Sequence, residues 1–203
     1  MTTAERNSLQ IYALQELIVN TRAFLQKNTI VPGNAAGTNF GVADYAIDVE
    51  DGYIRRPGSI LGKYKMHLGL KYKIKNPNQL PNGFRFKAVY LPVQQSNTNF
   101  VTVTLPNSGE GTNLMITTQL TGCSVIIDRN GNSVNVAHIQ PNGETGIQLQ
   151  NRLTTLGHNV FGAIDYPNDR AIVIGTRSKS VWNFFAQVQD ANFNVRRVKI
   201  LQF

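Results

Sequence analysis

The sequence predicts an α+β fold for its 203 residues: a mostly antiparallel β-sandwich, or a strongly bent mixed sheet, flanked by two helices. Helical periodicity is confined to the N-terminus and to residues 144–156. Most other segments alternate between apolar and polar residues, as strands with one buried face do. No linker, repeat or low-complexity tract divides the chain, and its length suits one core, so we expect residues 1–203 to form a single domain.

Residues 2–28 are predicted to form one helix. Thr2 and Glu5 have the spacing of a capping box, and an apolar stripe of leucine, isoleucine and phenylalanine follows them. Pro32-Gly33 ends any continuation. Residues 31–59 are rich in glycine and asparagine with scattered apolar residues, and both short strands and a long surface loop remain open there.

Residues 63–75 alternate between basic odd positions and apolar even positions, with Gly69 as the exception. This pattern predicts a strand with one buried face and one basic face. The basic face is either a solvated face that protects a sheet edge, or a docking surface for an acidic partner. Nucleic acid fits less well, because the tyrosines point away from the lysines and cannot stack bases on that face. The docking residues would be Lys63, Lys65, Lys71 and Lys73.

The remaining elements follow from alternation and from turn residues. Residues 144–156 have a helical apolar stripe that ends at Gly157. The other predicted elements are strands at residues 84–91, 100–105, 114–120, 170–176, 181–189 and 195–203.

A β-hairpin is predicted between residues 124–128 and 133–137, with Asn130-Gly131 as its turn. If these two residues are the centre of the turn, Cys123 lies directly opposite His138. The two side chains would then share a face, with Cβ atoms about 4.5–5.5 Å apart. A single bulge would move one of them to the other face.

The paired thiol and imidazole indicate a nucleophilic cysteine activated by a histidine. A lone cysteine in a β-rich chain is more commonly a small core hydrophobe, so both interpretations stay open. A histidine across the ladder favours catalysis, as does Gly122, which would allow close backbone approach. Backbone amides of Gly122, Cys123 or Ser124 would receive a developing oxyanion.

The segment Leu120-Thr121-Gly122-Cys123 resembles the Leu-Ser-Gly-Cys signature of the cytotoxic necrotizing factor catalytic domain and of Burkholderia lethal factor. These toxins deamidate a glutamine of a host protein, and a histidine follows their signature on the next strand, as His138 does here. The resemblance covers residues 117–140, and Thr121 departs from the serine. It implies that a backbone carbonyl near Thr117 orients His138.

Composition excludes several other classes of protein. One cysteine excludes a disulfide framework and a cysteine-rich zinc site, and three scattered histidines give no metal-ligand spacing. No Gly-rich phosphate loop is present, so we expect neither a metal nor a cofactor. No apolar run is long enough for a membrane span, and the polar N-terminus is not a signal peptide. The net charge of +8 favours an acidic partner.

The sequence therefore predicts a thiol-dependent hydrolase, and the resemblance makes it a protein glutamine deamidase of the toxin or effector type. We expect a monomer that is secreted without a cleavable signal and acts in the host cytoplasm. By the resemblance its substrate would be a host protein such as a small GTPase or a translation factor. Transglutaminase and cysteine peptidase activities use the same chemistry. A non-enzymatic module that binds protein or nucleic acid through its basic strand is the remaining alternative.

Overall fold

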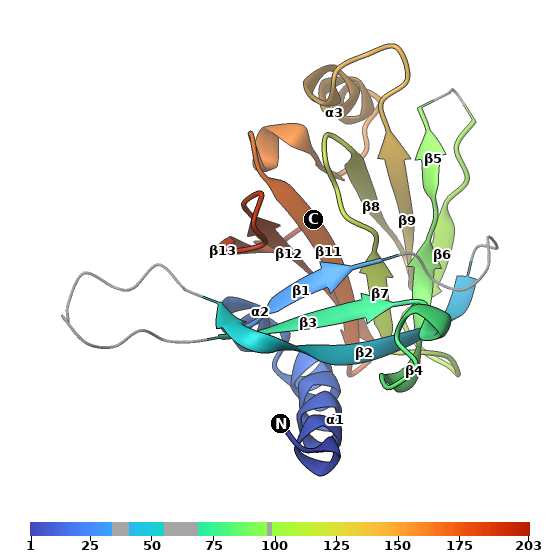
Figure 1. The fold of residues 1–203 in the computed structure, drawn as a ribbon. Coiled ribbons are helices and arrows are strands. Elements are labelled where there is room, and N and C mark those ends of the chain that lie inside the picture. The colour runs from blue at the N-terminus through green and yellow to red at the C-terminus, as the bar shows by residue number, and fades with distance from the viewer. Residues whose placement is uncertain (34–40, 55–68, 97–98) are drawn as a thin grey trace.

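The computed structural model describes residues 1–33, 41–54, 69–96 and 99–203, and it confirms the α+β fold (Figure 1). The α-helices are α1 (Thr3–Val19), α2 (Thr21–Lys27) and α3 (Gly146–Thr155), and the short 3-10 helices are η1 (Pro77–Gln79) and η2 (Ala163–Asp165). The strands are β1 (Thr29–Pro32), β2 (Gly41–Ile54), β3 (Gly69–Lys75), β4 (Phe84–Leu91), β5 (Val93–Gln95), β6 (Val103–Pro106), β7 (Leu114–Thr117), β8 (Ser124–Asn130), β9 (Ser133–Gln140), β10 (Val160–Phe161), β11 (Arg170–Ser178), β12 (Val181–Gln189) and β13 (Val195–Leu201).

These strands form two sheets. The first is a strongly bent mixed sheet with the order β1-β3-β2-β4-β7-β11-β12-β13. The second has the order β10-β8-β9-β5, and β6 also pairs with β9. The pairs β1–β3, β4–β7 and β5–β9 are parallel, and the other pairs described are antiparallel. The expectation of a mostly antiparallel arrangement is therefore confirmed.

Three apolar cores hold the layers together. The largest lies between the two sheets and includes Val125 and Val136 from the second sheet with Val173 and Trp182 from the first. A second core joins α1 and α2 to the outer face of the first sheet, and a smaller one joins α3 to the outer face of the second. The helices α1 and α3 consequently lie on opposite sides of the molecule (Figure 1).

Two chain crossings connect the sheets at one corner. The chain passes from β4 to β5 at Pro92, and from β7 to β8 through residues 118–123. The two crossings are neighbours, because β4 lies beside β7 and β5 lies beside β9, the partner of β8. Every predicted candidate of the catalytic site lies at or beside this corner.

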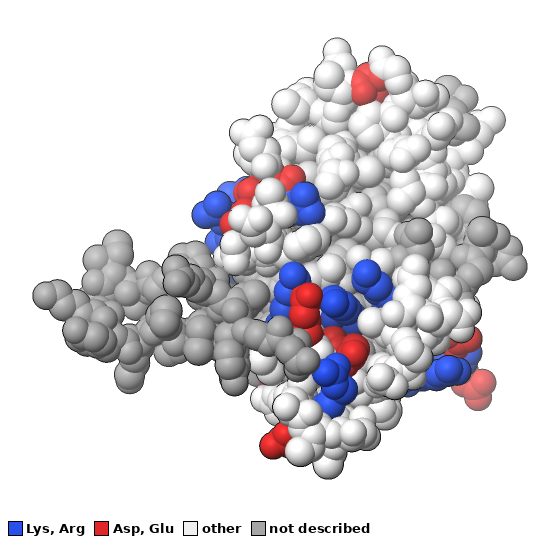
Figure 2. All heavy atoms as spheres, viewed as in Figure 1, with Lys and Arg blue, Asp and Glu red and all other residues white. Residues whose placement is uncertain are grey.

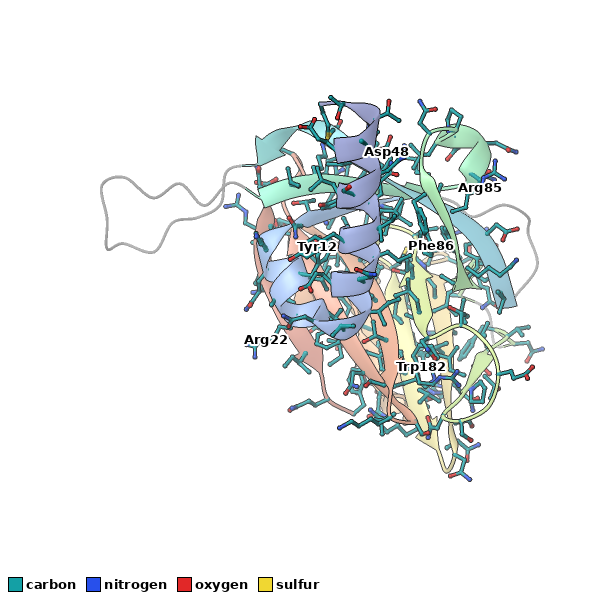
Figure 3. The ribbon with its side chains drawn as sticks, turned by 90° about the horizontal axis from the view of Figure 1, so that it is seen from below. Tyr12, Arg22, Asp48, Arg85, Phe86 and Trp182 are labelled. Atoms are coloured by element: carbon teal, nitrogen blue, oxygen red, sulfur yellow. The ribbon has the colours of Figure 1, made fainter. Side chains whose placement is uncertain are left out.

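The N-terminal helix begins as predicted but is not continuous. Thr2 and Glu5 form the capping box, with the Glu5 amide donating to Thr2 Oγ1 at 3.2 Å. The helix is interrupted at Asn20, whose φ of −133° and ψ of 48° are not helical, and α2 starts afresh after it. Figure 3 shows α1 across the first sheet, where Arg6 and Gln10 both donate to Asp48.

The other predicted elements are present with shifted ends. The helix predicted at 144–156 is α3, with Thr145 as its cap and Gly157 in the left-handed region at φ +89°. Residues 31–59, left open by the sequence, contain β2. The basic strand is confirmed as β3 over residues 69–75, whereas Lys63 and Lys65 lie outside the described residues.

Candidate functional site

The hairpin β8–β9 is present, but its predicted register is wrong. Asn130 pairs with Ser133, so the two turn residues are Gly131 and Asn132 and not Asn130 and Gly131. Gly131 has φ +54°, and Asn132 is not in the left-handed region, which is the glycine placement that a type II′ turn requires. The shift places Val125, and not Cys123, opposite His138.

Cys123 nevertheless stays on the same side of the sheet as His138. Residues two apart on a strand share a face, and Cys123 lies two residues before Val125, one position outside β8. Both Cys123 and Val125 belong to the core between the sheets. The two side chains therefore face the same side of the second sheet, and no hydrogen bond joins them within the described residues.

The thiol of Cys123 is nearly buried, with 8% of the residue exposed. Burial raises the pKa of this thiol above its ordinary value, and a backbone hydrogen bond from Thr121 offsets only part of the rise. Cys123 is therefore a neutral thiol at pH 7 in this conformation. A thiolate must be produced by a base during the reaction.

The backbone before Cys123 turns sharply at Gly122, whose φ is +94°. A Cβ at Gly122 would meet no atom within 4 Å, so the close backbone approach that the sequence suggested does not occur there. The glycine is required by its left-handed backbone conformation. The close approach occurs at Gly146, at the start of α3, where a Cβ would lie 2.4 Å from the Gly122 carbonyl oxygen. The start of α3 thus packs against the cysteine turn.

The amide of Gly122 is not free to bind an oxyanion in this structure. It donates at 3.1 Å to the hydroxyl of Tyr166, which itself donates to the Cys123 carbonyl oxygen at 2.5 Å. The Cys123 amide makes no hydrogen bond within the described chain and so remains a candidate donor. Ser124 is the first residue of β8, and its buried hydroxyl is without a hydrogen-bond partner among the described residues.

His138 is completely buried in the middle of β9, between β8 and β5. Burial lowers the pKa of His138 to about 4, so the imidazole is neutral at pH 7. Its Nδ1 lies 3.3 Å from Thr118 Oγ1, and its Nε2 makes no hydrogen bond within the described residues. A neutral imidazole with one open nitrogen can accept a proton.

His138 Nδ1 contacts the hydroxyl of Thr118, and no backbone carbonyl near Thr117 makes a hydrogen bond to the imidazole within the described residues. Thr117 is also buried, but its hydroxyl accepts a hydrogen bond from the Val173 amide at 2.9 Å and so belongs to the first sheet. The next residue begins the crossing to the second sheet and directs its hydroxyl toward the imidazole. Sequence reasoning missed Thr118 and Tyr166, because neither residue belongs to the four-residue signature.

His158 does not join this site. His158 Nδ1 lies 2.7 Å from Asp128 Oδ2. His158 also packs edge-on against Phe100, a residue of the small core beneath α3. His67 lies outside the described residues.

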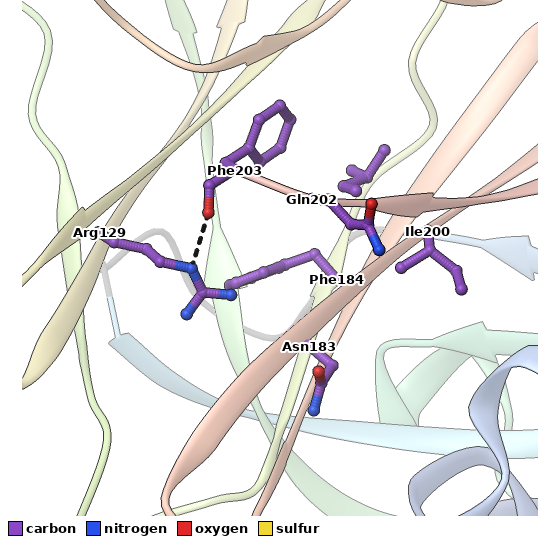
Figure 4. A pocket seen from close by; sticks show the side chains of 7 residues that line it. Arg129, Asn183, Phe184, Ile200, Gln202 and Phe203 are labelled. Carbon is purple, nitrogen blue, oxygen red and sulfur yellow. Dashed lines mark hydrogen bonds between the residues drawn. The ribbon is translucent and has the colours of Figure 1, made fainter.

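Two surface hollows of the described chain are lined by other residues. One of about 430 Å³ lies at the end of β13 and is shown in Figure 4. There Arg129 Nε donates to the Phe203 carbonyl oxygen at 3.0 Å. A second, of about 230 Å³, lies between β6 and the start of β2 and is lined in part by Trp182 and Arg177. Neither hollow contains Cys123 or His138.

The lysines predicted for partner binding are partly neutralised where the structure describes them. Lys71 Nζ lies 3.0 Å and Lys73 Nζ 3.2 Å from the carboxylate of Glu50 on the neighbouring strand β2. Figure 2 shows the same mixture, with acidic side chains among the basic ones on this face. The basic residues of β3 therefore lie beside a carboxylate of β2 in the same sheet.

No cluster of three potential metal ligands occurs within the described ranges. None of the described helices is long and apolar enough to cross a membrane. Comparison with known proteins adds no family, since no family model matches the sequence and no curated protein matches it significantly.

Proposed function

We propose that this protein is a thiol-dependent glutamine deamidase that acts on another protein, with Cys123 as nucleophile and His138 as general base. The observation that carries the proposal is the half-bonded imidazole of His138. It is buried on the same face as Cys123, is contacted at Nδ1 by Thr118, and makes no hydrogen bond at Nε2 with any residue that the structure describes.

A buried polar atom without a partner costs about 1–3 kcal/mol of stability. A site selected for packing alone would replace such a histidine with an apolar residue. Catalysis gives the open nitrogen a purpose, because Nε2 then accepts the proton of the Cys123 thiol. Hydrogen bonds of catalytic pairs are commonly long or absent before substrate binds and tighten in the complex.

The reaction follows from these two groups. The Cys123 proton passes to His138 Nε2, and the sulfur attacks the side-chain carboxamide carbon of the target glutamine. The free amide of Cys123 stabilises the negative oxygen of the tetrahedral intermediate. His138 returns the proton to the departing nitrogen, ammonia leaves, and a thioester remains. Water, deprotonated by His138, hydrolyses the thioester to glutamate and regenerates the thiol.

The choice of a protein glutamine as substrate rests on the resemblance of residues 120–123 to the toxin signature. The geometry supports a thiol-dependent reaction, and the resemblance supplies the class of substrate. Water as the acceptor of the acyl group gives deamidation, whereas an amine would give a transglutaminase and a backbone amide substrate would make the protein a peptidase.

The test is mass spectrometry of a panel of small GTPases and translation factors after incubation with the protein. We expect a gain of about one mass unit at a single glutamine, which disappears with Cys123→Ser because serine is not ionised near neutral pH. Thr117→Ser is the matched control, since that hydroxyl belongs to the first sheet. Cleavage of the target or a gain equal to an added amine would assign the site to the other two activities. An unmodified panel together with equal thiol reactivity in wild-type and His138→Leu protein would exclude the dyad.

A further inference from the structure

We propose that Tyr166 is a positioning residue for the Cys123 nucleophile, an inference that rests on the proposed function. Its hydroxyl binds both sides of the cysteine turn: it donates to the Cys123 carbonyl oxygen at 2.5 Å and accepts from the Gly122 amide at 3.1 Å. One hydroxyl therefore holds the peptide group that precedes Gly122 and the peptide group that follows Cys123, so it clamps both ends of the Gly122-Cys123 turn.

The side chain of Tyr166 is held in place by its own surroundings. It is 2% exposed, and its ring packs against Phe161 with the ring centroids 5.6 Å apart. It follows η2 directly, in a turn held by Asp165, whose Oδ2 accepts from the Gly162 amide at 3.1 Å and from Gln150 Nε2 at 2.7 Å. The hydroxyl thus transmits a position set by a different part of the chain.

The carboxylate of Asp165 is tied on its other side as well. Its Oδ1 accepts from Lys199 Nζ on β13 at 2.8 Å. Burial acts to raise the pKa of Asp165, but the hydrogen bonds from Lys199, Gly162 and Gln150 outweigh it and lower the pKa. The turn beneath Tyr166 is therefore anchored to α3 and to the first sheet by a stable anion.

The hydroxyl acts on the thiol through the shape of the turn. Gly122 has φ +94° and lies between Cys123 and Thr121, whose backbone hydrogen bond to the thiol lowers the pKa of Cys123 and so favours the thiolate. The Gly122 amide is bound to Tyr166, whereas the Cys123 amide makes no hydrogen bond within the described chain. The Cys123 amide is therefore the donor available beside the sulfur. Burial raises the pKa of Tyr166 strongly, so the phenol remains a hydrogen-bond donor across the working pH range.

The test is Tyr166→Phe, which removes one oxygen and keeps the ring. We measure iodoacetamide alkylation of Cys123 as a function of pH, together with kcat and KM for deamidation. The relaxed turn loses the Thr121 interaction, so we expect the apparent pKa of Cys123 to rise by about one unit, which lowers the thiolate fraction near pH 7 about tenfold. The kcat should fall with KM unchanged, because Tyr166 is buried and offers substrate no surface to bind.

Two variants keep the result interpretable. Tyr72→Phe removes the hydroxyl of a buried tyrosine in the core beneath α1 and should leave the alkylation profile unchanged. Asp165→Asn retains the Tyr166 hydroxyl but loosens the turn that carries it. It should raise the apparent pKa of Cys123 in the alkylation profile by less than Tyr166→Phe does. It replaces Tyr166→Phe if that variant does not fold.

A merely structural role for Tyr166 predicts a lower unfolding free energy with an unchanged profile, and that result would overturn the inference. Faster alkylation would also overturn it, because Tyr166 would then only cover the thiol. The two proposals fail separately. A shifted profile without deamidation by wild-type protein would reject the activity and keep the positioning of the thiol. Deamidation by wild-type protein, together with an unchanged alkylation profile and an unchanged kcat in Tyr166→Phe, would keep the activity and reject the positioning role of Tyr166.

Discussion

Gln187 and His138 are both polar, both 0% exposed and both in the middle of central strands, yet they are bonded very differently. The Gln187 amide donates to two carbonyl oxygens at the end of α2, at 2.7 Å and 2.6 Å. Its oxygen accepts from the Ile30 amide at 3.0 Å and from Gln189 Nε2 at 2.7 Å. Within the described residues His138 has one long contact, 3.3 Å between Nδ1 and Thr118 Oγ1, and its Nε2 makes no hydrogen bond.

The comparison separates a buried polar group that serves the fold from one that is kept for chemistry. Gln187 substitutes for main-chain partners where α2 meets β1, and each of its hydrogen-bonding atoms has at least one partner. His138 joins nothing that would otherwise be unpaired except the Thr118 hydroxyl. Removing Gln187 should therefore damage stability, and removing His138 should damage activity.

The largest effect is expected for His138→Leu. Loss of the general base should lower kcat/KM for deamidation by about 10²–10⁴-fold. The free energy of unfolding should change by less than about 1.5 kcal/mol, because an apolar replacement removes the unpaired nitrogen with the ring. Turnover assays and urea unfolding measure the two quantities. Activity within tenfold of wild type, or a loss of stability as large as that of Gln187→Leu, would make His138 a core residue.

Gln187→Leu should give the opposite pattern. The carbonyl oxygens of Leu25 and Asn28 and the amide of Ile30 lose their buried partner, which we expect to lower the free energy of unfolding by about 3 kcal/mol. Deamidation per folded molecule should stay at the wild-type rate. A fall in kcat at full folding would show that this end of the first sheet influences the site, and the comparison would lose its meaning.

The pH dependence of stability provides a third measurement. The folded-state pKa of His138 is lowered to about 4, so the unfolded chain takes up its proton first, near 6.5, as the pH falls. The contribution of His138 to the free energy of unfolding is fully present above pH 6.5. It declines as the pH falls toward 4, by about 3 kcal/mol in all. Urea unfolding at pH 7 and pH 4.5 should show this decline in wild type and a smaller one in His138→Leu. Equal declines would mean that His138 is already charged in the folded protein.

The smallest effects are expected at the basic strand, where the polar groups are partly exposed and paired. Lys71→Gln and Lys73→Gln should each change the free energy of unfolding by less than about 1 kcal/mol, since both lysines share Glu50 near solvent. Their association rate with the protein substrate should change about as little as that of Lys75→Gln, a lysine that makes no ion pair in the described chain. A tenfold slower, salt-dependent association would restore the docking surface.

Periodicity was sufficient for the secondary structure and insufficient for the register. Apolar runs bounded by turn residues located β4, β8 and β9, because such runs are a local signal, although parts of all three strands are buried on both faces. The offset of the hairpin depends on which residue takes the first turn position, and Asn130-Gly131 and Gly131-Asn132 are both acceptable turn pairs. The break at Asn20 was also hidden, since an apolar stripe continues across it.

The composition of the site could be predicted only in part. Cys123 and His138 are close in sequence and belong to one hairpin, so a local argument brings them together. Thr118 and Tyr166 enter through the crossing of two sheets and through a turn 43 residues beyond Cys123. No spacing rule relates such residues, because their contact depends on how the sheets pack.

The corner at which the chain crosses between the sheets has a consequence for folding. The β8–β9 hairpin is a local structure that can form early, whereas the partners of its cysteine and histidine arrive only when distant segments dock. A peptide comprising the hairpin alone would therefore carry both reactive groups and show the reactivity of an ordinary thiol. Reactivity of Cys123 that depends on His138 should appear in refolding experiments only with the final docking of the sheets, and a partly folded chain should react as an ordinary thiol.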